Sequence, residues 1–155
     1  MNKKKMEKEI YSFNEILLKK GKKVCTLNNG YICNSDKADE IIRMFYKDDI
    51  ELYESFFILC INNANKPIGF AKIGQGGLRG TIVDISIVCK FAIDTLATGI
   101  IIAHNHPSGQ KTPSSEDIRI TKNIKEALKI FNIRFIDHII LTSDGHYSFQ
   151  DEGTL

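Results

Sequence analysis

Residues 103–117 read AHNHPSGQKTPSSED and place two of the chain's four histidines one residue apart. The apolar run at 100–103 comes directly before them and predicts a buried strand that stops at Pro107. The polar segment 107–113, which contains Pro and Gly, predicts a loop, and residues 114–132 predict an amphipathic helix. In α/β folds ligands bind beyond the carboxyl ends of strands, so this strand–loop–helix unit is the best candidate for a site.

The other segments predict a single α/β domain in which helices flank a mixed sheet. One helix is expected over 35–49 with Ser35 or Asp36 as its cap, and another begins near Asp84 and is ended by Gly99. The helix at 114–132 is expected to carry these apolar residues on or near one face: Ile118, Ile124, Leu128 and Phe131. The expected strands are a hairpin of 54–62 and 68–74, then 100–106, 133–143 and a short return at 146–149.

Composition and charge narrow the class of protein. The first 35 residues differ from the rest and are interpreted as an N-terminal extension, 1–35, before a domain at 36–155. A net charge of +2, from 21 basic and 19 acidic residues, is too balanced to indicate nucleic acid or an anionic membrane as a partner. The four cysteines form no C-x-x-C pair, the charged start is unlike a signal peptide, and no apolar run approaches the length of about 18 residues that spans a membrane. A soluble, cytoplasmic protein is therefore expected.

His104 and His106 could bind one metal ion. Side chains at positions i and i+2 of a strand share a face, so both imidazoles are expected on the same side. The best third ligand is Asp117, eleven residues after His106 and in the first turn of the next helix. Two histidines, one carboxylate and an open position for water would make a catalytic metal site.

The same residues also have simpler interpretations. Ser114, with Asp117 three residues later, is typical of a capping box that starts a helix. A His-x-His pair at a strand end is more often structural or solvent-facing than a metal ligand. The interpretations can coexist, because Ser114 can cap the helix while Asp117 points at a metal, and the combination of these residues in one short unit favours a metal site.

Asp137 and His138 point to opposite faces of a later strand and are interpreted as structural or, at most, as support for the ligands.

The stretch HNHPSGQKTPSSED resembles the signature of RadC-type proteins, within the JAB/MPN+ (JAMM) metalloprotease-like superfamily. The pattern of that superfamily is an upstream Glu, then His-x-His, seven residues and Ser-x-x-Asp. Here His106 is followed by seven residues, 107–113, and then by Ser114 to Asp117 without a gap. The resemblance covers roughly 36–155 and implies a cytidine-deaminase-like, JAB-type fold with a mixed sheet flanked by helices.

The resemblance implies a role for each residue of the pattern. Three residues would hold Zn²⁺: His104, His106 and Asp117. Ser114 would donate a hydrogen bond to the water on the metal or to the oxyanion that develops on a carbonyl. The upstream general base would be Glu54, at the start of the first long strand, with Glu51 as the runner-up.

The activity that this resemblance implies is zinc-dependent hydrolysis of peptide or isopeptide bonds, in that superfamily often at a ubiquitin-like C-terminus. The partner would then be a protein or peptide substrate. The DNA-repair association of the RadC family gains no support from the charge of this chain, whose first 35 residues also lack a recognisable helix-hairpin-helix region. Two alternatives stay open: a non-catalytic metal-binding or protein-binding module of the same fold, and a DNA-repair accessory protein or metal-dependent nuclease with a basic patch around the metal.

Overall fold

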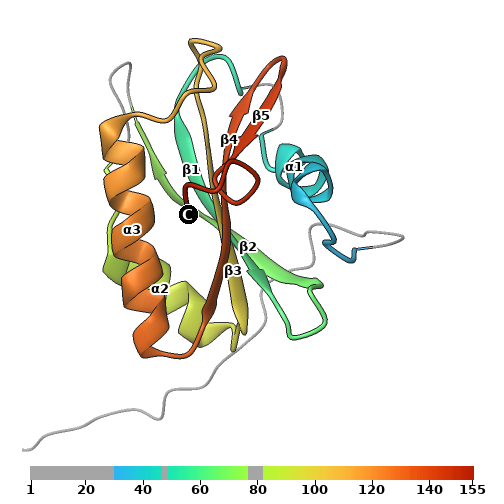
Figure 1. Cartoon of the computed structure of the whole chain (residues 1–155), viewed down its shortest axis with the longest axis vertical. Coiled ribbons are helices and arrows are strands. Elements are labelled where there is room, and N and C mark those ends of the chain that lie inside the picture. The colour runs from blue at the N-terminus through green and yellow to red at the C-terminus, as the bar shows by residue number, and fades with distance from the viewer. Residues whose placement is uncertain (1–29, 47–48, 77–81) are drawn as a thin grey trace, which may run out of the picture.

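The computed structural model describes residues 30–46, 49–76 and 82–155, and Figure 1 shows a central sheet with helices on both of its faces. The elements in chain order are α1 (Ser35–Arg43), β1 (Ser55–Ile61), β2 (Pro67–Gln75), α2 (Ile85–Asp94), β3 (Gly99–Asn105), α3 (Ser115–Ile130), β4 (Arg134–Thr142) and β5 (Gly145–Ser148). The expected α/β class is confirmed. Most of the expected N-terminal extension, residues 1–29, lies outside the described residues.

The sheet is mixed, as the sequence predicts. Its strand order is β2-β1-β3-β4-β5, and β3 and β4 are parallel while the other neighbouring strands are antiparallel. Parallel neighbours need a crossover connection, and α3 supplies it. The carboxyl end of β3 therefore leads through one loop to the start of α3. Within the described ranges no helix is both long and apolar enough to cross a membrane.

Both central strands are buried on their two faces, which explains their continuous apolar sequence. On the face that packs on α1, β1 and β3 contribute Phe57, Leu59, Ile101 and Ala103. On the face that packs on α2 and α3 they contribute Phe56, Ile58, Ile100 and Ile102. Because side chains alternate along a strand, His104 points to the α2/α3 face and Asn105 to the α1 face.

Three expected helix boundaries are wrong: the start and the end of α1, and the end of α2. The cap of α1 is Asn34, whose side chain accepts a hydrogen bond from the Lys37 N–H at 2.9 Å, and the helix ends at Arg43. Helix α2 starts after Asp84 as expected but ends at Asp94, well before Gly99. Gly99 instead begins β3, where a Cβ would lie 2.9 Å from Cγ1 of the buried Ile61. Close packing between strands therefore explains this glycine better than helix termination.

The expected buried face of α3 is only half right. Ile118 and Phe131 are exposed, at 54% and 48% of their surface. The buried residues of this helix are Asp117, Thr121, Ile124 and Leu128. This stripe is apolar toward the end of the helix and polar at its beginning, so the start of α3 brings polar side chains against the sheet.

Candidate metal centre

The start of α3 fixes the position of the Asp117 carboxylate. Ser114 is the N-cap, and its Oγ accepts a hydrogen bond from the Asp117 N–H at 3.1 Å. In return Oδ2 of Asp117 accepts the Ser114 N–H at 2.7 Å, which completes a capping box. The capping interpretation is thus confirmed, and the remaining lone pairs of the carboxylate are available on the side of β3.

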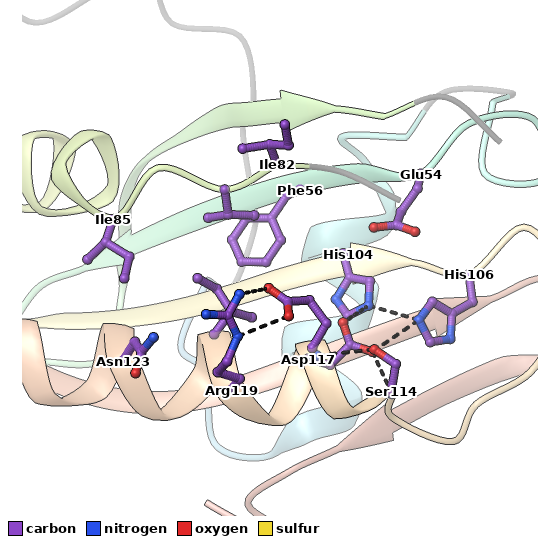
Figure 2. A pocket seen from close by; sticks show the side chains of 13 residues that line it. Glu54, Phe56, Ile82, Ile85, His104, His106, Ser114, Asp117, Arg119 and Asn123 are labelled. Atoms are coloured by element: carbon purple, nitrogen blue, oxygen red, sulfur yellow. Dashed lines mark hydrogen bonds and ion pairs between the residues drawn. The ribbon is translucent and has the colours of Figure 1, made fainter. Parts of the chain in front are cut away.

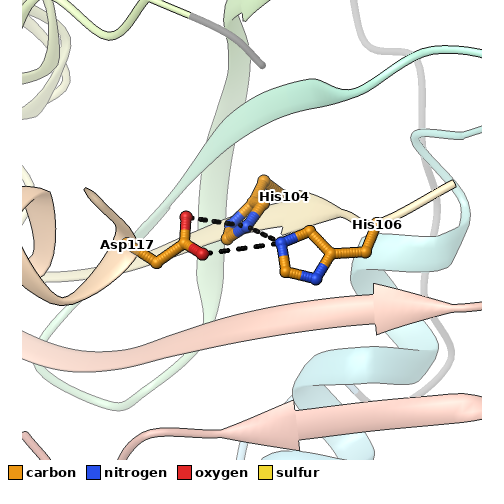
Figure 3. Close-up of side chains that lie close together, drawn as sticks. All are labelled: His104, His106 and Asp117. Carbon is orange, nitrogen blue, oxygen red and sulfur yellow. Dashed lines mark hydrogen bonds and ion pairs between the residues drawn. The ribbon is translucent and has the colours of Figure 1, made fainter. Parts of the chain in front are cut away.

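The structure brings His104, His106 and Asp117 together as one group that could hold a metal ion (Figure 3). Nε2 of His104 lies 3.0 Å from Nε2 of His106 and 3.1 Å from Oδ1 of Asp117, and Nε2 of His106 lies 3.5 Å from Oδ2 of Asp117. In a tetrahedral zinc site, ligand atoms at about 2.0–2.1 Å from the ion are about 3.3 Å apart. The three donor groups therefore lie close enough to converge on a four-coordinate ion with one position left for water.

The imidazole of His106 presents a lone pair to this cluster. Its Nδ1 lies 2.6 Å from the carbonyl oxygen of Gln110. A carbonyl can only accept, so Nδ1 carries the ring proton of the neutral imidazole and Nε2 is the acceptor atom. When Nε2 is protonated as well, it can donate to Asp117, and this hydrogen bond raises the pKa of His106 above its ordinary value.

Asp117 is held in its ionised form. Burial opposes ionisation of this carboxyl, but the adjacent imidazoles of His104 and His106 and the Ser114 hydroxyl outweigh the burial and hold its pKa far below the ordinary value. A carboxylate that is ionised and oriented is the form that binds a cation.

Ser114 has a hydroxyl that is already engaged. Its Oγ–H donates to Oδ2 of Asp117 at 2.6 Å, so in this structure the side chain orients the candidate ligand. The role that the resemblance implies, donation to the water or to an oxyanion, requires the same proton and stays a prediction.

A cavity of about 670 Å³ lies beside the three ligands, and Glu54 lines it (Figure 2). Phe56 of β1 pairs with His104 of β3 in antiparallel register, and extending this register by two residues along each strand places Glu54 opposite His106. Figure 2 shows the Glu54 carboxylate on the wall that faces the imidazoles. Glu51 is exposed and is not among the described residues that line the cavity. The location therefore favours Glu54 as the candidate base.

The rest of the lining is apolar on one side and charged at the rim. The apolar side includes Phe56, Ile82, Val83, Ile85 and Ile120. Among the described lining residues the carboxylates are Glu54, Glu116 and Asp117, and the one guanidinium is that of Arg119. Nε of Arg119 donates to Glu116 at 3.0 Å, so this positive charge is already paired.

Sequence reasoning missed Asn105, which stands between the two histidines but points to the other face of the sheet. It is fully buried, and its side-chain oxygen accepts the Ser55 N–H at 2.7 Å. Its amide group donates to the carbonyl oxygens of Ile50 and Tyr53 at 2.6 and 2.7 Å. The sequence did hold a signal for this residue, because a polar side chain on a buried strand needs hydrogen-bond partners.

His138 lies directly against a candidate ligand. Its Nε2 is 2.8 Å from Nδ1 of His104, on the face of the sheet that α3 covers. Burial lowers the pKa of His138 well below its ordinary value, so the ring is neutral. The sequence allowed a supporting role for this residue at most, and its position agrees with that role.

The sequence of this domain matches a known protein family. The family model of the RadC-like JAB domain matches residues 32–154, and the chain belongs to that family. The match includes Ile32, which is buried in the core beside α1. The division at residue 36 between an extension and the domain stays a prediction.

The similar curated proteins are named UPF0758 proteins. The chain is 48% identical over 101 residues to one from Flavobacterium johnsoniae, and the match covers 65% of this chain and 44% of that protein. It is 39% identical over 103 residues to one from Porphyromonas gingivalis, and the match covers 66% of this chain and 45% of that protein. It is 36% identical over 126 residues to one from Clostridium botulinum, and the match covers 75% of this chain and 55% of that protein. The chain thus spans about half the length of these relatives.

Proposed function

We propose that this chain is a zinc-dependent hydrolase of peptide or isopeptide bonds. The observation that carries the proposal is that one cavity combines His104, His106 and Asp117, as three convergent ligands, with the carboxylate of Glu54. This is the donor set of a catalytic zinc site, in which three protein groups bind and the fourth position is left for water or substrate.

Each residue then has a separate task. A zinc ion held by His104, His106 and Asp117 would lower the pKa of a bound water to about 7 and would polarise the carbonyl of the amide. Glu54 would take a proton from the attacking water and pass it to the leaving amine. Ser114 holds Asp117 through the hydrogen bond at 2.6 Å, and apolar side chains beside Phe56 line one side of the cavity.

The charges of the cavity support an amide substrate over a phosphodiester. Three carboxylates line it, and the guanidinium of Arg119 is paired with Glu116. Among the described lining residues, no basic side chain is left unpaired for a phosphate, whereas nucleases and DNA-binding sites present unpaired basic groups to phosphate. We therefore propose a protein or peptide partner, which includes a ubiquitin-like C-terminal tail as one form of substrate.

The first experiment measures metal content. The full chain is purified without a histidine tag, offered zinc, and compared with His106→Ala and Asp117→Ala. We expect about one zinc per chain in the wild type, as a three-ligand site requires, and loss of zinc in both variants. A wild-type chain that stays empty in excess zinc would contradict the proposal.

The second experiment tests catalysis with a matched pair of variants. Glu54→Gln removes the proposed base, and Glu51→Gln makes the same change three residues away at an exposed position. Zinc-loaded proteins are screened on peptide and isopeptide libraries by mass spectrometry. We expect cleavage by the wild type and Glu51→Gln, and loss of turnover by Glu54→Gln with its zinc retained. Zinc-loaded wild type that cleaves neither kind of bond would favour a non-catalytic metal-binding module.

A further inference from the structure

His138 occupies an enclosed slot behind His104, on the side away from the cavity. It is fully buried, and its ring stacks on Phe149 with the centroids 4.7 Å apart. A buried imidazole of this kind must satisfy both ring nitrogens within the protein, and it does so through two contacts that lead to two different candidate ligands.

The contacts form a continuous chain. Nδ1 of His104 lies 2.8 Å from Nε2 of His138. Nδ1 of His138 lies 2.6 Å from the hydroxyl oxygen of Thr121 on α3. The Thr121 hydroxyl in turn lies 2.5 Å from the backbone carbonyl oxygen of Asp117. This series of hydrogen bonds therefore begins at one candidate ligand, His104, and ends at the backbone of another, Asp117.

The direction of every hydrogen bond in this series follows from the last acceptor, the backbone carbonyl oxygen of Asp117. The carbonyl oxygen of Asp117 can only accept, so Thr121 uses its single proton there. Thr121 can then only accept from His138, which must carry its proton on Nδ1. Nε2 of the neutral His138 is left as an acceptor, so it receives the proton on Nδ1 of His104. Nε2 of His104 is thereby left with a lone pair that faces His106 and the Asp117 carboxylate.

We propose that His138 and Thr121 are positioning residues that fix His104 in the tautomer and ring orientation needed to bind the metal through Nε2. His106 obtains the same tautomer from the Gln110 carbonyl alone, whereas His104 depends on this two-residue relay. The inference rests on the proposed function in one respect, because it requires a zinc ion that binds to His104, His106 and Asp117.

Variants of His138 test the relay through metal affinity. His138→Phe fills the slot but removes the acceptor, and His138→Gln can accept from His104 with its oxygen and donate to Thr121 with its nitrogen. Zinc affinity is measured by competition with a chromophoric chelator, with circular dichroism as the check on folding. We expect His138→Phe to weaken zinc binding by about 10–100-fold, the usual cost of losing such a partner, and His138→Gln to recover most of the affinity.

A second pair of variants keeps the test valid if His138→Phe does not fold. Thr121→Val has the same shape without the hydroxyl, and Thr121→Ser restores the hydroxyl. We expect a loss of zinc affinity on the order of tenfold in the first and little change in the second. Long-range proton–nitrogen NMR of the zinc-loaded wild type should report the ring proton on Nδ1 in both His104 and His138.

Three results would overturn the inference in distinguishable ways. Wild-type zinc affinity in both His138→Phe and Thr121→Val would overturn the relay and leave the proposed hydrolase standing. A ring proton on Nε2 of His138 would mean that the hydrogen bond with His104 runs in the opposite direction. This result would overturn the relay and leave the proposed hydrolase standing. A wild-type chain that takes up no zinc would overturn the proposed function, and the relay with it.

Discussion

The side-chain oxygen of Asn105 accepts a hydrogen bond from the backbone N–H of Ser55 at 2.7 Å, in the interior of the domain. The amide group of the same side chain donates to the carbonyl oxygens of Ile50 and Tyr53. Glu54 stands between Tyr53 and Ser55, so both of its chain neighbours are held by one asparagine. Asn105 thus connects the strand of the two histidines to the segment of the proposed base.

We expect Asn105→Ala to uncouple metal binding from catalysis. The variant leaves buried backbone groups without partners, so it should lower the free energy of unfolding by roughly 1–3 kcal/mol. Zinc affinity should change little, because the ligands lie on the opposite face of the sheet. Turnover should fall, because Glu54 is no longer held in place. Urea unfolding, chelator competition and peptide cleavage measure the three quantities on the same protein.

Hydrogen exchange at the Ser55 amide gives the direct check, with Asn63→Ala as the control at an exposed asparagine in the turn between β1 and β2. The Ser55 amide should exchange faster in Asn105→Ala than in the control. Equal protection of this amide in the two variants would show that Asn105 does not hold the segment.

Ser114→Ala separates two roles for one hydroxyl. The hydroxyl caps α3 and donates to Asp117, so its loss should lower the free energy of unfolding by about 1 kcal/mol and weaken zinc binding. Ser114→Thr keeps both hydrogen bonds and should behave as the wild type. The matched control is Ser115→Ala, at the exposed neighbouring position. Unchanged zinc affinity with reduced turnover would instead assign the hydroxyl to the bound water or to the oxyanion that develops on the carbonyl, as the resemblance implies.

The three candidate ligands could be predicted from the sequence because their geometry is local. His104 and His106 share a face through the two-residue repeat of a strand, and Asp117 is placed by the capping box three residues after Ser114. No contact between distant parts of the chain is needed to recognise the trio. The same locality explains why the bounds of β3 and α3 lie within two residues of those expected from the sequence.

The supporting contacts could not be predicted, because they depend on strand register. His138 meets His104 only because β3 and β4 are parallel neighbours in the observed alignment, where His138 pairs with Ile102. Asn105 meets Ser55 only because of the register between β3 and β1. Register is set by packing of the whole apolar face, which sequence spacing does not contain. The buried face of α3 was misjudged for a related reason: Thr121 is polar, and only its partner makes burial favourable.

Asp137 offers a further test away from the ligands, because two opposing effects act on its carboxyl. The side chain is buried, and it accepts hydrogen bonds from Ser148 Oγ at 2.6 Å and from the backbone N–H groups of His138 and Gln150 at 2.7 and 3.0 Å. Burial raises the pKa of this carboxyl, and the hydrogen bonds oppose that rise without cancelling it.

We expect the difference in free energy of unfolding between wild type and Asp137→Asn to shift in favour of the wild type as the pH falls from about 7 to about 4. The folded carboxyl takes up a proton at a higher pH than the unfolded one, whose pKa is about 3.9, so acid stabilises the folded wild type in this window and does not act on the asparagine. Urea unfolding with a chelator present measures the shift. Ser148→Ala removes a hydrogen bond that favours the ionised form, so it should enlarge the shift. A shift in favour of Asp137→Asn would mean that the hydrogen bonds outweigh burial.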